Sequence, residues 1–180
     1  MEMAKSKTFE LVRAAICTAA TAVLSLITIP LPFSAVPFSL SLLAVFLCGA
    51  LLEPKWAVTS QLTYLLIGAA GIPVFSGFRG GLSVLVGPTG GFLIAYPLMA
   101  LTVSLAVKGS GRKNMTSLLC GMAAAIVICY ALGASWLMLS TGMSVAAALS
   151  AAVLPFIIPD ILKAFIAAAA ARAVAIRFGK

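Results

Sequence analysis

The chain has 180 residues, of which 63% are hydrophobic and 9% are charged, and its mean hydropathy is +1.19. Soluble globular domains carry about 25% charged residues, so this composition excludes an ordinary soluble domain and indicates an integral membrane protein. The formal net charge of +8 does not indicate nucleic-acid binding, because the basic residues form short clusters between apolar runs, as is typical of membrane proteins.

Apolar runs in the first two thirds of the chain predict four membrane-spanning helices, since a span needs about 20 mostly apolar residues. The first helix is expected at residues 9–29, retained rather than cleaved as a signal peptide, and three prolines then form a loop. The second and third are expected at 38–52 and 56–71, and the fourth at 92–107, after a glycine-rich loop at 72–91.

The stretch from Met115 to Pro159 carries no charge and could hold one span or two. We predict one, at 115–139, with a short outer-surface helix at 144–154 and a sixth span at 159–178, because this arrangement returns the basic C-terminal residues to the cytoplasm. Residues 1–180 are therefore expected to form a single all-α membrane domain with six transmembrane helices and both termini cytoplasmic. With no targeting segment recognised, a multi-pass protein of a bacterial plasma membrane is expected.

The side-chain inventory argues against an enzyme. The chain has no histidine, and its four carboxylates (Glu2, Glu10, Glu53 and Asp160) do not form a pair of acids around a common site. The residues suggest no metal-ligand cluster, and the glycine-rich loop lacks the lysine of a phosphate-binding motif. We therefore predict a binding protein without cofactor or metal.

Asp160 and Lys163 begin the last span and lie three residues apart, so they share a helix face. Ionisable groups within a span are costly and usually face a cavity, where this pair could bind a ligand with an N–H donor and an acceptor or negative end. Alternatively, Asp160 simply suits the helix dipole while Lys163 pairs with it or reaches the interface.

Three further polar residues are candidates for ligand contact. Arg79 lies in the glycine-rich loop, where it could bind a ligand carboxylate or remain a solvated loop charge. Gln61 and Tyr64 lie one turn apart in the third span and could contact either the ligand or a neighbouring helix.

Aromatic residues gather around the two predicted outer loops. They would form either the walls of a small-molecule pocket or an interfacial aromatic belt; they are Phe33, Phe38, Phe75, Phe92 and Tyr96. In the first span, Ala15 and Ala19 are four residues apart and permit close helix approach, either within the bundle or to a partner.

Three segments together resemble the BioY family of biotin-specific substrate-binding (S) components of energy-coupling factor transporters. They are GIPVFSGFRGG from Gly71, GPTGG from Gly87, and LPFIIPDILKA from Leu154. The resemblance covers nearly the whole chain and implies the six-helix S-component fold, with a biotin site at the outer face that includes Asp160, Lys163 and Arg79. It also implies that Ala15 and Ala19 dock a transmembrane coupling protein that carries two ATPase subunits.

The predicted function is therefore biotin uptake across the plasma membrane, with Phe38, Phe75, Gln61 and Tyr64 as further candidate ligand contacts. Lys163 is favoured over Arg79 as the partner of the ligand carboxylate. Two alternatives stay open: an S component for another vitamin, and a membrane protein with a structural role and no transport function.

Overall fold

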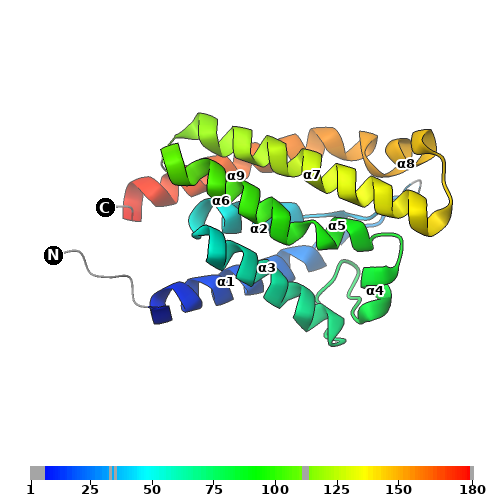
Figure 1. The fold of residues 1–180 in the computed structure, drawn as a ribbon, viewed down its shortest axis with the longest axis horizontal. Helices are drawn as coiled ribbons and strands as arrows, with labels where there is room; N and C mark the ends of the chain where they lie inside the picture. Colours follow the sequence, from blue (N-terminus) through cyan, green and yellow to red (C-terminus); the bar gives the residue numbers. More distant parts are fainter. Residues whose placement is uncertain (1–6, 33, 35, 111–113, 179–180) are drawn as a thin grey trace.

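The computed structural model describes residues 7–32, 34, 36–110 and 114–178, and these are mostly helical (Figure 1). The elements in chain order are α1 (Lys7–Leu26), β1 (Thr28–Ile29), β2 (Phe38–Ser39), α2 (Ser41–Leu51), α3 (Pro54–Ala69), α4 (Leu82–Val86), α5 (Gly90–Ile94), α6 (Tyr96–Ser110), α7 (Met115–Thr141), α8 (Val145–Ala152), the 3-10 helix η1 (Leu154–Phe156) and α9 (Ile157–Phe178).

The helix ends follow from local sequence. Pro54 occupies the first turn of α3, where its missing N–H costs no hydrogen bond. The side chain of Asn114 accepts hydrogen bonds from the backbone N–H groups of Thr116 and Ser117 and so caps α7. Gly142, with φ of 71°, takes the left-handed conformation that ends α7, and Ser144 caps α8 in the same way as Asn114 caps α7.

Four helical segments among the described residues are long and apolar enough to cross a membrane: Lys7–Leu26, Gly90–Ser110, Met115–Thr141 and Val145–Arg177. Two of the six predicted spans are shorter, because α2 has 11 residues and α3 has 16. At 1.5 Å per residue neither helix alone covers a hydrocarbon core of about 30 Å. Helix length therefore does not establish the six-span count.

Two predicted loops contain regular structure. The strands β1 and β2 pair antiparallel on either side of the proline loop, with Thr28 opposite Ser39 and Ile29 opposite Phe38. This pairing uses residues assigned to the ends of the first two predicted spans, so α1 and α2 are shorter than expected. The glycine-rich segment likewise includes the short helix α4.

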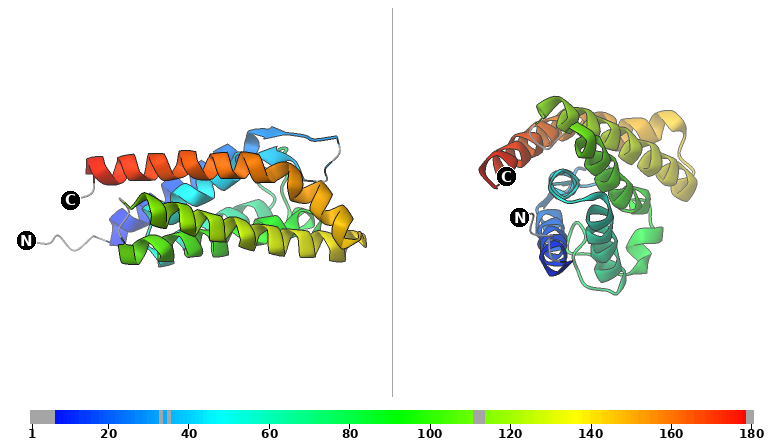
Figure 2. Two further views of the ribbon diagram at one scale, coloured as in Figure 1. Left: turned by 90° about the horizontal axis from the view of Figure 1, so that it is seen from above. Right: turned by 60° about the vertical axis from the view of Figure 1, so that its left-hand side comes forward.

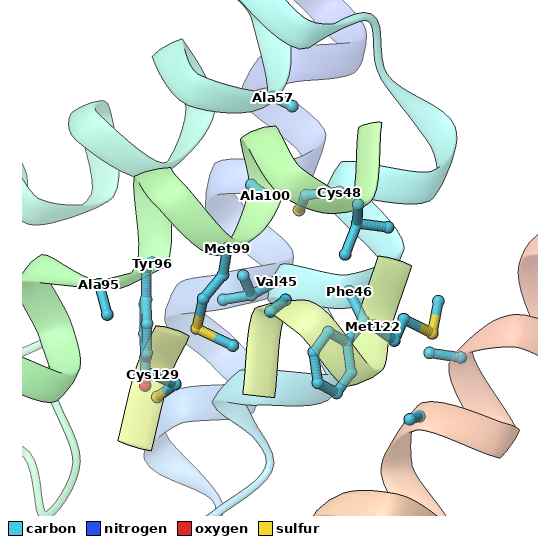
Figure 3. Close-up of a cluster of buried hydrophobic side chains, with 14 of the residues drawn as sticks. Val45, Phe46, Cys48, Ala57, Ala95, Tyr96, Met99, Ala100, Met122 and Cys129 are labelled. Carbon is cyan, nitrogen blue, oxygen red and sulfur yellow. The ribbon is translucent and has the colours of Figure 1, made fainter. Parts of the chain in front are cut away.

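Side chains of α2, α6 and α7 pack together in a central part of the core (Figure 3). Val45 and Phe46 of α2, Met99 of α6 and Met122 of α7 are fully buried there. Helix α2 approaches α6 closely at Gly49, where an added Cβ would lie 2.7 Å from the carbonyl oxygen of Ala100. Small residues of this kind are typical of tight helix packing in membranes.

The beginning of α1 and the end of α9 lie at the same end of the bundle (Figures 1 and 2). Helices α4 and α8 and the β1–β2 hairpin lie at the opposite end. The candidate site is built at this second end.

Candidate functional site

A cavity opens at the end of the bundle that holds α4, α8 and the β1–β2 hairpin. It has about 630 Å³ of empty space, part of it continuous with the outside. Its lining combines apolar walls with a few polar groups, as is typical of small-molecule sites. Its lining is drawn from the hairpin, the glycine-rich segment and helices α2, α5, α6, α7, α8 and α9: Val36, Pro37, Ser39, Ser41, Leu42, Phe75, Ser76, Arg79, Val84, Thr89, Phe92, Leu93, Tyr96, Cys129, Tyr130, Ala152, Phe156, Asp160 and Lys163.

Asp160 and Lys163 form a buried ion pair at the wall of this cavity. The Lys163 Nζ atom lies 2.8 Å from Asp160 Oδ1, and the two residues are 5% and 3% exposed, respectively. Both are in the first turns of α9, whose 3.6-residue period places them on one face. Either charge would be costly to bury alone, so each residue needs the other as its partner in this wall.

Two aromatic side chains hold this ion pair in place. The hydroxyl of Tyr130 on α7 donates a hydrogen bond of 2.8 Å to Asp160 Oδ2. The Lys163 Nζ atom lies 4.1 Å from the centre of the Phe38 ring, within range of a cation–π interaction. Both carboxylate oxygens of Asp160 thus have a donor, while Phe38 contacts the ammonium group.

Arg79 lines the same cavity but is exposed. It pairs with Phe75 through reciprocal backbone hydrogen bonds of 2.9 and 3.2 Å, and its Nε atom donates to the carbonyl oxygen of Ser76. Gly77 closes this tight turn with φ of 76°. Arg79 therefore places a cation at the rim, whereas Lys163 places one in the buried wall.

Phe75 packs into an aromatic cluster behind the cavity. Its ring meets Tyr64 edge-on, with 5.5 Å between the ring centres, and Tyr64 stacks on Tyr96 at 6.1 Å. The hydroxyls of Tyr96 and Ser41 are 2.6 Å apart. The cluster fixes the aromatic wall formed by Phe75 and Tyr96.

Gln61 and Tyr64 are not among the described residues that line the cavity; both belong to α3, and both form hydrogen bonds with α1. Gln61 Nε2 donates to Thr21 Oγ1 at 3.2 Å, and the Tyr64 hydroxyl donates to Ser25 Oγ at 2.9 Å. Of the two contacts that the sequence left open for Gln61 and Tyr64, the structure shows the one with a neighbouring helix, α1. Gln61 Oε1 is buried without a hydrogen-bond partner among the described residues.

Ala15 and Ala19 lie exposed on α1, beside the buried face formed by Ala14 and Thr18. The Thr18 hydroxyl donates to the carbonyl oxygen of Ser60 at 2.9 Å, so this buried face packs on α3. The two alanines thus form no part of that packing. Phe33 lies outside the residues that the structure describes.

A sequence model of the BioY family matches residues 1–180. The chain belongs to the BioY family. It is 41% identical over 129 residues to a probable biotin transporter of Pyrococcus horikoshii, covering 72% of this chain and 74% of that protein. It is 37% identical over 159 residues to a biotin transporter of Thermotoga maritima, covering 88% and 91%, respectively.

One solved structure extends the likeness to three dimensions. The S-component for biotin from an ECF-type ABC transporter superposes with a TM-score of 0.88 at 26% sequence identity, covering 97% of this chain and 94% of that one. Together with the family match, this likeness identifies the present BioY chain as a transporter subunit rather than an enzyme.

Sequence reasoning missed one important residue of this BioY site, Tyr130. It lies in the middle of the uncharged α7, 30 positions from Asp160 in the chain, and the two side chains meet only because α7 packs on α9. A phenol inside an apolar span needs a hydrogen-bond partner, and this need was the available signal.

Proposed function

We propose that this chain binds biotin in the cavity beside Asp160 and Lys163 and acts as the S component of an energy-coupling factor transporter in the plasma membrane. Membership of the BioY family and the likeness to biotin transporters support the ligand. The observation that carries the proposal is the buried ion pair in the wall of an otherwise largely apolar cavity. An ion pair costs less when it is exposed to water, so its burial beside an open cavity favours a recognition role.

The chemistry of biotin fits this wall. Its ureido group offers N–H donors and a carbonyl acceptor, which match the carboxylate of Asp160 and the ammonium of Lys163, respectively. Its tail ends in a carboxylate that needs a cation. The sequence favoured Lys163 for this role, but the pairing of Lys163 with Asp160 inside the wall favours Arg79 at the rim.

We extend the proposal to six spans with cytoplasmic termini. The shared location of the α1 and α9 ends supports an even number of crossings. The shorter helices α2 and α3 would complete the count: α2 is largely buried by the longer helices, and the β1–β2 hairpin continues its path toward the cavity end.

The exposed alanines of α1 suit a partner. Ala15 and Ala19 present a small-residue surface on which a helix of the transmembrane coupling protein could pack closely. That protein would in turn connect this chain to two ATPase subunits, which the present chain does not supply.

Titration of the purified chain with biotin tests the function directly. We expect saturable binding at one site that excess thiamine or riboflavin does not displace. Mass spectrometry of small molecules released from the denatured protein provides an independent measurement. Displacement by another vitamin would favour the other-vitamin alternative, and absence of any binding by the folded chain would leave a structural role.

Tyr130→Phe should weaken biotin binding roughly 10- to 100-fold, because a hydrogen bond to a charged group contributes about 1.5–3 kcal/mol. The ring still fills its place between α7 and α9, so only the hydroxyl on Asp160 Oδ2 is lost. Titration of Tyr130→Phe in the Asp160→Asn background separates two explanations: no further loss means that Tyr130 acts through Asp160. An additional loss of the same size would mean that Tyr130 contacts biotin itself.

A further inference from the structure

The glycine-rich segment between α3 and α5 turns large apolar side chains outward. Phe78, Leu82 and Val86 are 69%, 66% and 68% exposed. Leu82 and Val86 are four residues apart and share one face of α4, while Val84 and Leu85 pack against the core. A segment surrounded by water would gain nothing from an apolar outward face.

Two hydrogen bonds determine where α4 lies along the bundle. The N–H of Gly81, just before α4, donates to the carbonyl oxygen of Gly68 in the last turn of α3 at 2.7 Å. Just after α4, the carbonyl oxygen of Gly87 accepts from Trp136 Nε1 at 2.9 Å. Trp136 precedes the end of α7 by five residues, or about 7.5 Å of helix. Helix α4 therefore lies beside the bundle, below its end, and it lies at the edge of the molecule in Figure 1 and in the right-hand view of Figure 2.

The helices that flank α4 expose apolar residues at this same depth. Leu66, on the last turns of α3, is 69% exposed. Leu139 of α7 is 85% exposed and lies closer to the helix end than Trp136. The exposed apolar surface of the spans thus reaches the level of α4, and the outward face of α4 is continuous with it.

The backbone at Phe78 supports the same conclusion. Its φ is 57°, the only positive value at a non-glycine residue in the described part of the chain. A bulky side chain in this left-handed region costs about 1–3 kcal/mol. The turn nevertheless presents the ring outward instead of packing it, which makes sense if an apolar medium surrounds it.

We propose that Phe78 and the Leu82–Val86 face of α4 insert into the phospholipid bilayer, at the boundary between its headgroups and acyl chains. Trp136, which bonds to Gly87 at the end of α4, is consistent with a position at the membrane interface, because the indole ring prefers this region. The segment that covers one side of the cavity is then anchored in lipid. This inference depends only on the placement of α4 and does not depend on which ligand the cavity binds.

Spin labels provide the test. Single cysteines replace Leu82, Val86, Val127 or Thr141 in a chain whose four cysteines are changed to alanine, reconstituted in phosphatidylcholine–phosphatidylglycerol vesicles. Val127, 66% exposed in the middle of α7, is the control inside the bilayer, and Thr141 at the exposed end of α7 is the control in water. We expect labels at 82 and 86 to collide severalfold more with oxygen than with a water-soluble nickel chelate, as the label at 127 does.

Labels at 82 and 86 that resemble the label at 141 would overturn the proposal, and so would labels shielded from both reagents, which indicate a protein contact. A second measurement avoids the cysteine-free background. Phe78→Trp should add tryptophan emission that brominated phospholipids quench, whereas Thr141→Trp should add emission that aqueous iodide quenches. Iodide quenching of the tryptophan at 78 would contradict insertion.

Discussion

Asp160→Asn and Lys163→Met should each weaken biotin binding about 100-fold or more and destabilise the fold by about 3–5 kcal/mol, because each change leaves a single charge buried. The partners are only 3% and 5% exposed, so water cannot compensate the remaining charge without opening the helix packing. The double variant Asp160→Asn/Lys163→Met buries no charge. It should therefore recover most of the stability and none of the lost affinity for biotin.

Thermal unfolding in detergent and biotin titration measure the two effects separately. Lys55→Met is the matched control, because Lys55 is exposed beside Trp56 at the opposite end of the bundle. Its change in stability should stay within about 0.5 kcal/mol. Single variants that keep full stability would show that the pair is hydrated, and a double variant that binds biotin normally would remove the pair from the site.

The positions of the long helices could be predicted from hydropathy alone. Helices α1, α7 and α9 lie within a few residues of the runs expected at 9–29, 115–139 and 159–178. The distribution of basic residues predicted the short α8: it favoured one span in the uncharged stretch before Pro159, which left a segment of that stretch for a short helix that does not cross the membrane. Both signals are local, so they required no knowledge of how the helices pack.

The features that the sequence did not reveal depend on contacts between distant segments. The β1–β2 pairing joins residues on both sides of a proline loop, and Tyr130 reaches Asp160 from another helix. From the sequence, Gln61 could equally have faced a ligand or α1. A buried polar residue on α3 is compatible with either position, so the sequence pattern did not distinguish them. Asp160 and Lys163 were found because three residues of spacing already bring them together.

Gly68→Ala should weaken biotin binding by about 10-fold or more and destabilise the fold by about 1–3 kcal/mol. A Cβ atom on Gly68 would occupy the place of the Phe75 ring, which is 1% exposed and forms part of the cavity wall. Tyr64 meets the ring edge-on and blocks its movement to that side, and backbone hydrogen bonds couple Phe75 to Arg79. Phe75 must therefore move toward the cavity, and Arg79 moves with it.

Gly109→Ala is the matched control for this substitution. An added Cβ at Gly109 meets no atom within 4 Å, and alanine is favoured over glycine in a helix by up to about 1 kcal/mol. The control should thus be neutral or slightly more stable, with unchanged biotin affinity. If Gly68→Ala behaved in the same way, the contact of α3 with Phe75 would not shape the binding site. A loss confined to Gly68→Ala would instead show that the close approach of Phe75 to α3 is needed to keep the aromatic wall and the rim cation in position.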